Sequence, residues 1–270
     1  MLKPEDAFPL DTDVTIGAHI YRAVSKGRLY LLVRSDCLEQ ADWGALFFDR
    51  PYPFFNGSPV LSGRGGGFTC ECSCGGRCFV RPFRRGGLWG KFVSKNYFTL
   101  SGRKDLRSLR PIAELELLEF LALKDIPVPT PIAAGVLFSR TGFVYRAALA
   151  TTLIPDAKNL LLWAKDTNAQ ERDMDKLSAS SEAAGHEAAR LLRNGVFHRD
   201  LHPGNVLVSR EEDRIFLIDF DGASKDVEQT KSDRKKFSIR LIARWNRSLR
   251  KHGLMDALGG CFEKGILNVD

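Results

Sequence analysis

Two short segments in the second half of the chain constrain its fold more than any other feature of the sequence. The first, residues 198–205, reads His-Arg-Asp-Leu-His-Pro-Gly-Asn and leads directly into the apolar run Val-Leu-Val. The second, residues 215–222, reads Ile-Phe-Leu-Ile-Asp-Phe-Asp-Gly. A polar turn at 210–213 separates the two apolar runs, so this order predicts a strand, a turn and a second strand. The two carboxylates and one carboxamide of these segments are therefore expected beside one hairpin.

The chemistry that fits these side chains is phosphoryl transfer. His-Arg-Asp-Leu followed by Asn has the form of a kinase catalytic loop, in which the carboxylate, here Asp200, orients the acceptor hydroxyl and takes its proton. Asn205 and Asp219 are the expected ligands of the Mg²⁺ that bridges the phosphates of ATP. A lone His-Arg-Asp would indicate a surface turn, with Asp219 as a strand-end cap. The full order of helix, loop, strand, turn and strand predicts a phosphotransferase instead.

One position departs from the kinase pattern. Asp221 occupies the place where the metal-binding Asp-Phe-Gly of kinases has glycine, and Gly222 is displaced by one residue. Two explanations stay open. Either a third carboxylate joins the metal site, or the backbone at this position does not need a positive φ.

The first half of the chain carries candidates for nucleotide binding. Gly63, Gly65 and Gly66 belong to a glycine run whose backbone N–H groups can approach phosphate, although a flexible turn fits the same residues. Arg81 stands where kinases have the lysine of Val-Ala-Ile-Lys, and Glu114, near the start of an amphipathic helix, is its expected partner. The alternative is an exposed strand arginine and a solvated helix glutamate.

The charge of the chain favours anionic partners. A net charge of +7 and a pI near 9.1 suit a nucleotide, a phosphorylated glycolipid or an anionic membrane surface. No nucleic acid is expected, because the sequence has no nucleic-acid-binding motif and no basic tail. It also has no apolar run of about 18 residues, and its first residues lack the pattern of a signal peptide. We therefore expect a cytoplasmic protein.

Four of the six cysteines form a cluster, Cys70, Cys72, Cys74 and Cys78. They could bind zinc, but their spacing is not that of a familiar zinc ribbon. On a strand, period two would put the first three on one face, where small apolar side chains pack well. We favour packing by reduced thiols, and a metal stays the alternative.

The hydrophobic pattern predicts a first lobe of residues 1–154. Within it, residues 68–83 read as a hairpin. Residues 106–124 have an apolar stripe at helical spacing, formed by Ile112, Leu115, Leu118 and Leu121 with Leu117, while Glu114, Glu116 and Glu119 are expected on the polar side. The prolines of residues 126–131 end that helix, because proline cannot continue it. Two strand-like runs follow, before a connector at 154–156.

The second lobe is predicted to span residues 155–270. Residues 181–193 are alanine-rich and read as a helix with Gly195 in a C-cap position. From about Lys231 the chain predicts a basic amphipathic helix. Its basic face rests on anionic lipid or on solvent, and consists of Arg240, Arg244, Arg247 and Lys251. Together the two lobes predict an α+β, protein-kinase-like bilobal fold, with a strand-rich N-lobe that holds one αC-like helix and a small, mostly helical C-lobe.

The sequence resembles the lipopolysaccharide kinase (Kdo/WaaP) family, and within it the 3-deoxy-D-manno-octulosonic acid (Kdo) kinases. The resemblance spans about residues 60–250, and an Arg-Arg-Gly-Gly element and the prolines after the helix are its specific parts. The matching elements are Gly63-Arg64-Gly65, residues 80–87, Glu114 with Leu117-Leu118, residues 126–131, residues 195–201 and Trp245-x-Arg247-Ser248-Leu249.

The resemblance implies that the ATP γ-phosphate moves to a hydroxyl of Kdo attached to lipid A, at the cytoplasmic face of a Gram-negative inner membrane. It also implies that Asp200 is the active-site carboxylate and that Arg81 with Glu114 anchors the nucleotide. Arg84 and Arg85 would meet the anionic acceptor, or else lie in a solvated turn.

Three other functions stay open. An aminoglycoside-type kinase or a protein kinase would use the same reaction, although the chain has no Ala-Pro-Glu segment after Gly222 to build a peptide platform. A pseudokinase acting as a binding module would explain arginine for lysine at Arg81 and aspartate for glycine at Asp221.

Overall fold

The computed structural model divides the chain into two compact units. The first comprises Met1–Leu123 with Thr130–Leu153, and the second comprises Lys124–Pro129 with Ile154–Asp270. The boundary predicted after residue 154 stays a prediction. The residues that the structure describes are 11–40, 42–49, 59–60, 66–72, 76–83, 97–99, 105–166, 171–209, 214–226 and 228–267.

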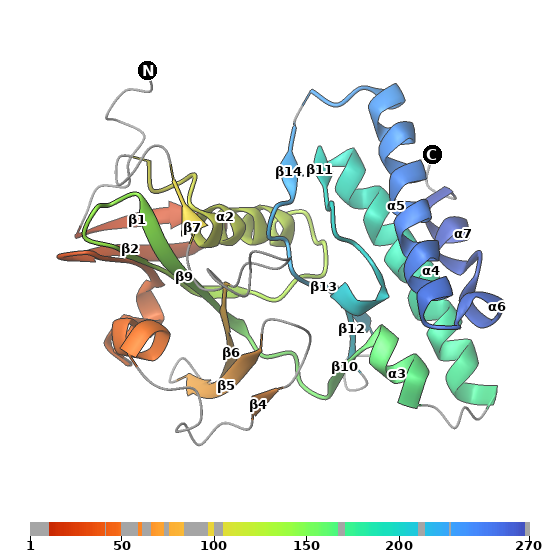
Figure 1. Cartoon of the computed structure of the whole chain (residues 1–270), viewed down its shortest axis with the longest axis horizontal. Coiled ribbons are helices and arrows are strands. Elements are labelled where there is room, and N and C mark those ends of the chain that lie inside the picture. Colours follow the sequence, from red (N-terminus) through yellow and green to blue (C-terminus); the bar gives the residue numbers. More distant parts are fainter. Residues whose placement is uncertain are drawn as a thin grey trace. The chain divides into compact units, whose positions relative to one another are not determined.

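The first unit is built on an antiparallel sheet (Figure 1). Across its described residues the strand order is β1-β2-β3-β8-β9-β6-β5-β4, and β7 pairs with β9 beside this path. The strands are β1 (Thr12–Ile16), β2 (His19–Lys26), β3 (Leu29–Arg34), β4 (Pro59–Val60), β5 (Gly67–Cys72), β6 (Gly76–Pro82), β7 (Tyr97–Phe98), β8 (Pro131–Phe138) and β9 (Val144–Thr152).

Two-residue turns set the register of the first three strands. Ile16 pairs with His19, and Lys26 pairs with Leu29. Each turn begins with a glycine at positive φ, +61° at Gly17 and +63° at Gly27. Such tight hairpins need this backbone conformation, which glycine adopts without steric strain.

Helix α2 (Arg110–Ala122) packs against β8 and β9 (Figure 1). It starts with Pro111 in its first turn, where the missing N–H is not needed. The predicted apolar stripe is confirmed, because Ile112, Leu115, Leu118 and Leu121 are buried. The expectation that the glutamates of this helix are its polar side is wrong for Glu114 and Glu119, which are also buried.

Glu119 is buried because the first hairpin supplies its partners. Its carboxylate accepts hydrogen bonds from Tyr21 Oη at 2.6 Å and from the backbone N–H of Ala18 at 3.3 Å, and His19 Nδ1 lies 2.8 Å away. Burial and this carboxylate raise the pKa of the Tyr21 hydroxyl, which therefore stays protonated and donates. These contacts fix α2 against β1 and β2.

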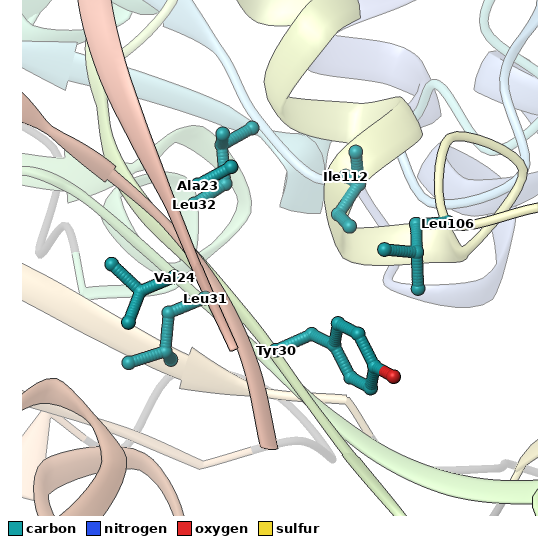
Figure 2. Close-up of a pocket in the computed structure, with 7 residues that line it drawn as sticks. All are labelled: Ala23, Val24, Tyr30, Leu31, Leu32, Leu106 and Ile112. Carbon is teal, nitrogen blue, oxygen red and sulfur yellow. The ribbon is translucent and has the colours of Figure 1, made fainter. Parts of the chain in front are cut away.

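The rest of the first unit's core is apolar. The helical turns η2 (Ser35–Gln40) and η3 (Ala45–Asp49) contribute Cys37, Trp43 and Phe47 to a cluster with side chains of β3, β6, β8 and β9. A small hollow near the start of α2 is lined by apolar groups and the ring of Tyr30 (Figure 2). Because it contains no carboxylate or cation, it is not a candidate for phosphate chemistry.

In its described residues, the second unit combines helices with two small antiparallel sheets (Figure 1). The helices are α3 (Leu160–Asp166), α4 (Glu171–Arg193), α5 (Lys231–Lys251), α6 (Met255–Leu258) and α7 (Cys261–Leu267), with the single turn η5 (Pro203–Asn205). The sheets are β10 (Ala157–Asn159) with β12 (Val206–Ser209) and β13 (Arg214–Leu217), and β11 (Val196–Phe197) with β14 (Ser224–Lys225). None of the described helices has the length and apolar character that crossing a membrane requires.

The predicted helices of this unit are present, with one change of boundary. Helix α4 begins at Glu171, well before the predicted start at 181, and Gly195 follows its end at a φ of +73°. Helix α5 begins where predicted, because Thr230 and Asp233 form a reciprocal capping box at its N-terminus.

Two glycines let α4 and α7 approach closely. A Cβ at Gly185 would lie 2.2 Å from the Phe262 carbonyl oxygen, and one at Gly265 would lie 2.0 Å from the Glu182 carbonyl oxygen. Next to this contact the Phe262 ring stacks on Trp245 of α5, with centroids 4.2 Å apart. The helices of the second unit therefore depend on two positions without side chains.

Gly185→Ala should lower the free energy of unfolding by about 1–3 kcal/mol, because a methyl group cannot fit against the α7 backbone. The gain in helix propensity, about 1 kcal/mol, acts in the opposite direction and is smaller. Gly76→Ala is the matched control, since nothing lies within 4 Å of the Cβ it adds. Urea unfolding of both variants measures the effect, and a Gly185→Ala protein as stable as the wild type would contradict the close packing.

Candidate active site

Hydrogen bonds within the second unit bring Asp200, Asn205 and the segment before Asp219 together. Asn205 Nδ2 donates to the Asp200 carbonyl at 2.9 Å. The Ile218 N–H donates to the Asn205 carbonyl at 3.0 Å. The predicted hairpin is confirmed, because Val206 of β12 pairs with Leu217 of β13. Asp219 thus follows directly on a strand that is tied to the loop of Asp200.

His198 holds the two segments together from inside the unit. Its side chain is buried, its Nε2 lies 3.1 Å from the Ile218 carbonyl oxygen, and its ring lies against Phe220 at 4.5 Å between centroids. Burial lowers the pKa of His198 to about 4. The imidazole is therefore neutral near pH 7 and donates to Ile218. Sequence reasoning included His198 in the motif but gave it no role.

The interior of the loop is also fixed by side chains. His202 Nδ1 accepts a hydrogen bond from the Gly204 N–H at 2.9 Å, and Asn159 Nδ2 donates to the Gly204 carbonyl. Asn159 also caps α3, because its Oδ1 accepts from the Leu161 N–H at 2.9 Å. Nothing in the sequence around Asn159 indicated this contact, since the two segments are far apart along the chain.

The turn after Asp219 shows why glycine is not needed at position 221. The positive φ angles lie at Asp219, +64°, and at Gly222, +80°, and not at Asp221. The backbone at Asp221 therefore does not demand glycine, which is one of the two explanations given above. Participation of the Asp221 carboxylate in a metal site stays a prediction.

The donor set fits a magnesium ion. Because Asn205 Nδ2 binds the Asp200 carbonyl, the side-chain oxygen is the atom left to bind a cation, and no hydrogen bond within the described residues uses it. The Asp219 carboxylate would supply the second oxygen ligand. Mg²⁺ prefers such oxygen ligands and usually completes its shell with phosphate and water. Asn205 and Asp219 would hold the ion.

Arg244 of α5 is a residue of this site that sequence reasoning missed. Its Nη2 makes an ion pair with Asp200 Oδ1. His202 Nε2 lies 4.0 Å from the same oxygen. The expectation that the basic face of α5 meets only solvent or lipid is wrong for Arg244. The helical pattern places it on that face, but nothing in the sequence says which carboxylate it meets.

In the first unit, the predicted pair of Arg81 and Glu114 is brought together. Arg81 Nη2 lies 2.6 Å from both carboxylate oxygens of Glu114, and the guanidinium stacks over the Phe83 ring at 4.5 Å. Glu114 is buried, so the alternative of a solvated helix glutamate is wrong. Gly66 lies at a φ of +53° before β5, whereas Gly63 and Gly65 lie outside the described residues, as do Arg84 and Arg85.

The cysteines pack across the hairpin of β5 and β6. Cys70 pairs with Cys78 in the register, and their sulfur atoms are 2.9 Å apart. No group of three or more His, Cys, Asp or Glu side chains suited to a metal ion occurs in the described part of the chain, from which Cys74 is absent. The contact between Cys70 and Cys78 fits the packing interpretation, and a metal stays the alternative.

Comparisons with known proteins agree with this geometry. A sequence model of the Lipopolysaccharide kinase (Kdo/WaaP) family matches residues 58–254. The chain belongs to this family. A 3-deoxy-D-manno-octulosonic acid kinase of Vibrio parahaemolyticus is 34% identical over 64% of this chain and 66% of the relative. A kinase of the same name from Xylella fastidiosa is 29% identical over 80% of this chain and 79% of the relative.

A solved structure shows the same fold. It is described as WaaP in complex with acyl carrier protein, and it matches 89% of this chain and 89% of its own with a TM-score of 0.51 and 17% identity. The predicted kinase-like α+β fold is confirmed by this neighbour and by the strand-rich and helical units described above.

The buried neutral His198 predicts a pH-dependent stability. Its folded pKa of about 4 is below the ordinary value of 6.5, so the unfolded chain takes up the proton first as the pH falls. The stability is complete above about pH 6.5 and is lost between there and pH 4, at up to about 1.4 kcal/mol per pH unit. His202, whose pKa is also lowered by burial, acts in the same direction.

His198→Gln should flatten this dependence, because the glutamine amide does not titrate. The measurement is the free energy of urea unfolding near pH 7 and near pH 5, with His186→Gln of α4 as the control. An equal loss of stability in His198→Gln and in the wild type would show that another group is responsible.

Proposed function

We propose that this protein transfers the γ-phosphate of ATP to a hydroxyl of Kdo on Kdo-lipid A, during assembly of the lipopolysaccharide inner core. The observation that carries the proposal is the loop of residues 198–205 bonded to the segment before Asp219, in a chain that belongs to the Kdo/WaaP family. The relatives named Kdo kinase support the choice of acceptor.

Each site residue has one task in this reaction. Asp200 orients the acceptor hydroxyl and takes its proton as the oxygen attacks phosphorus. Asn205 and Asp219 hold Mg²⁺, which when bound neutralises the phosphate charge. Arg81 supplies a cation for the phosphates of ATP, and the buried carboxylate of Glu114 fixes its guanidinium. Gly63, Gly65 and Gly66 would lie over the phosphates.

A peripheral position at the cytoplasmic face of the inner membrane fits the acceptor, because lipid A is anchored in the bilayer by its acyl chains. Helix α5 suits such a surface, since nine of its 21 residues are Lys or Arg and one is acidic. Basic residues near an anionic membrane contribute about 1 kcal/mol each. The residues proposed to face lipid are Lys236, Arg240, Arg247 and Lys251, all exposed.

Asp200→Asn should abolish transfer while ATP binding is retained. Removal of a general base costs about 10²–10⁴ in rate, and the metal ligands are untouched. The assay incubates each protein with ATP, Mg²⁺ and Kdo-lipid A and detects the phosphorylated glycolipid by mass spectrometry. Asp226→Asn, at an exposed position outside the site, is the matched control and should stay active.

Two results would contradict the proposal. Retained turnover by Asp200→Asn would remove this residue from its role. A wild-type protein that leaves Kdo-lipid A unchanged but phosphorylates a peptide or an aminoglycoside would have a different acceptor.

Asp219→Ala should give a different defect from Asp200→Asn. Loss of a metal ligand weakens the binding of Mg²⁺·ATP, so the half-maximal Mg²⁺ concentration should rise by about tenfold or more. Titration calorimetry of ATP with and without Mg²⁺ measures the effect. Wild-type Mg²⁺ dependence in this variant would exclude Asp219 as a ligand.

A further inference from the structure

The contact between Arg244 and Asp200 creates a conflict with the reaction. The guanidinium of Arg244 holds Asp200 Oδ1, one of the two oxygens of the carboxylate, so this carboxylate is not free to turn toward an acceptor hydroxyl. For transfer to begin, Arg244 has to exchange this partner for another anion.

The surroundings of Arg244 allow such an exchange. The backbone of α5 is held in place by three buried side chains, Leu241, Trp245 and Leu249. The Arg244 and Asp200 side chains themselves are 42% and 46% exposed, so a ligand from solvent can reach both. A pair with this exposure is weak, because water screens it. The backbone of Arg244 is therefore fixed, while its guanidinium can turn from one anion to another.

The chemistry of the acceptor indicates which anion Arg244 binds in place of Asp200. Kdo is a sugar acid, and the planar guanidinium fork of arginine matches a carboxylate with two parallel hydrogen bonds. A hydroxyl of the same sugar has to approach Asp200 for transfer to occur. An arginine beside Asp200 is thus at the right place to bind a carboxylate of the molecule whose hydroxyl is phosphorylated.

We propose that Arg244 binds the carboxylate of the acceptor sugar, and that this binding releases Asp200 to act as the base. This inference rests on the proposed function, because it takes Kdo as the acceptor. It makes Arg244 a specificity-determining residue: acceptors without this carboxylate leave the guanidinium on Asp200 and are phosphorylated poorly.

The test compares two acceptors and four proteins. The acceptors are Kdo-lipid A and the same glycolipid with its Kdo carboxylates converted to carboxamides. The proteins are the wild type, Arg244→Gln, Arg244→Lys and, as the matched control, Arg250→Gln, which removes an exposed arginine of α5 that is not among the residues proposed to face lipid. The kcat and KM for each acceptor are measured at saturating Mg²⁺·ATP, and thermal unfolding checks that each variant is folded.

The wild type and Arg250→Gln should prefer the carboxylate acceptor by about 10- to 100-fold in kcat/KM, the range expected for a hydrogen-bonded charge pair. Arg244→Gln should lose this preference, mainly through a higher KM for the carboxylate acceptor, while its KM for ATP is unchanged. Arg244→Lys keeps the charge without the fork and should recover part of the preference.

Other results separate the inference from the proposed function. A wild type that gives no phosphorylated glycolipid contradicts the proposed function itself. A wild type that uses both acceptors equally well overturns the inference alone, and this result does not depend on the folding of any variant. Equal loss of kcat with both acceptors in Arg244→Gln, with the preference retained, would also overturn it, because Arg244 would then only position Asp200.

Discussion

The hydrogen bond between His198 and the Ile218 carbonyl is the contact on which the candidate site depends. Both backbone groups of Ile218 are used, the carbonyl by His198 Nε2 and the N–H by the Asn205 carbonyl. The residue before Asp219 is thus fixed by the loop that carries Asp200. This arrangement requires a neutral imidazole, since a buried unpaired charge costs several kcal/mol. Burial lowers the pKa of His198 and keeps the ring neutral at physiological pH.

In the first unit, buried charged side chains likewise have hydrogen-bonding partners that fix the elements around them. Helix α2 buries two carboxylates, and each has partners: Arg81 for Glu114, and the hydroxyl of Tyr21 with the N–H of Ala18 for Glu119. Five residues apart on a helix, the two glutamates point in different directions. Because a buried carboxylate without partners is strongly unfavourable, both sets of contacts must form together. They fix the rotation of α2, and with it the position of Glu114 against β6.

The sequence predicted what depends on local order. The hairpin of β12 and β13, the apolar stripe of α2 and the start of α5 follow from periodicity and capping within a few residues. It did not predict contacts between distant segments. Its charge predicted that Glu119 lies on the polar side of its helix. That prediction failed because the partners that bury Glu119 come from a hairpin about a hundred residues earlier. In the sequence, Arg244 does not differ from the other basic residues of an amphipathic helix, and only the fold places it beside Asp200.

The two departures from the kinase pattern that favoured a binding module have physical explanations. At Arg81, arginine makes the ion pair with Glu114 that a lysine would make, and its planar group also stacks on Phe83. After Asp219, the chain needs its second positive φ at Gly222 rather than at Asp221. Asp219 itself adopts a positive φ, which aspartate tolerates better than most residues. The glycine is therefore displaced to the position where the backbone requires it, and the turn keeps a carboxylate at its first residue. The kinase pattern expects glycine two residues after the metal-binding aspartate, at Asp221, whereas the backbone of this chain needs it one residue later, at Gly222.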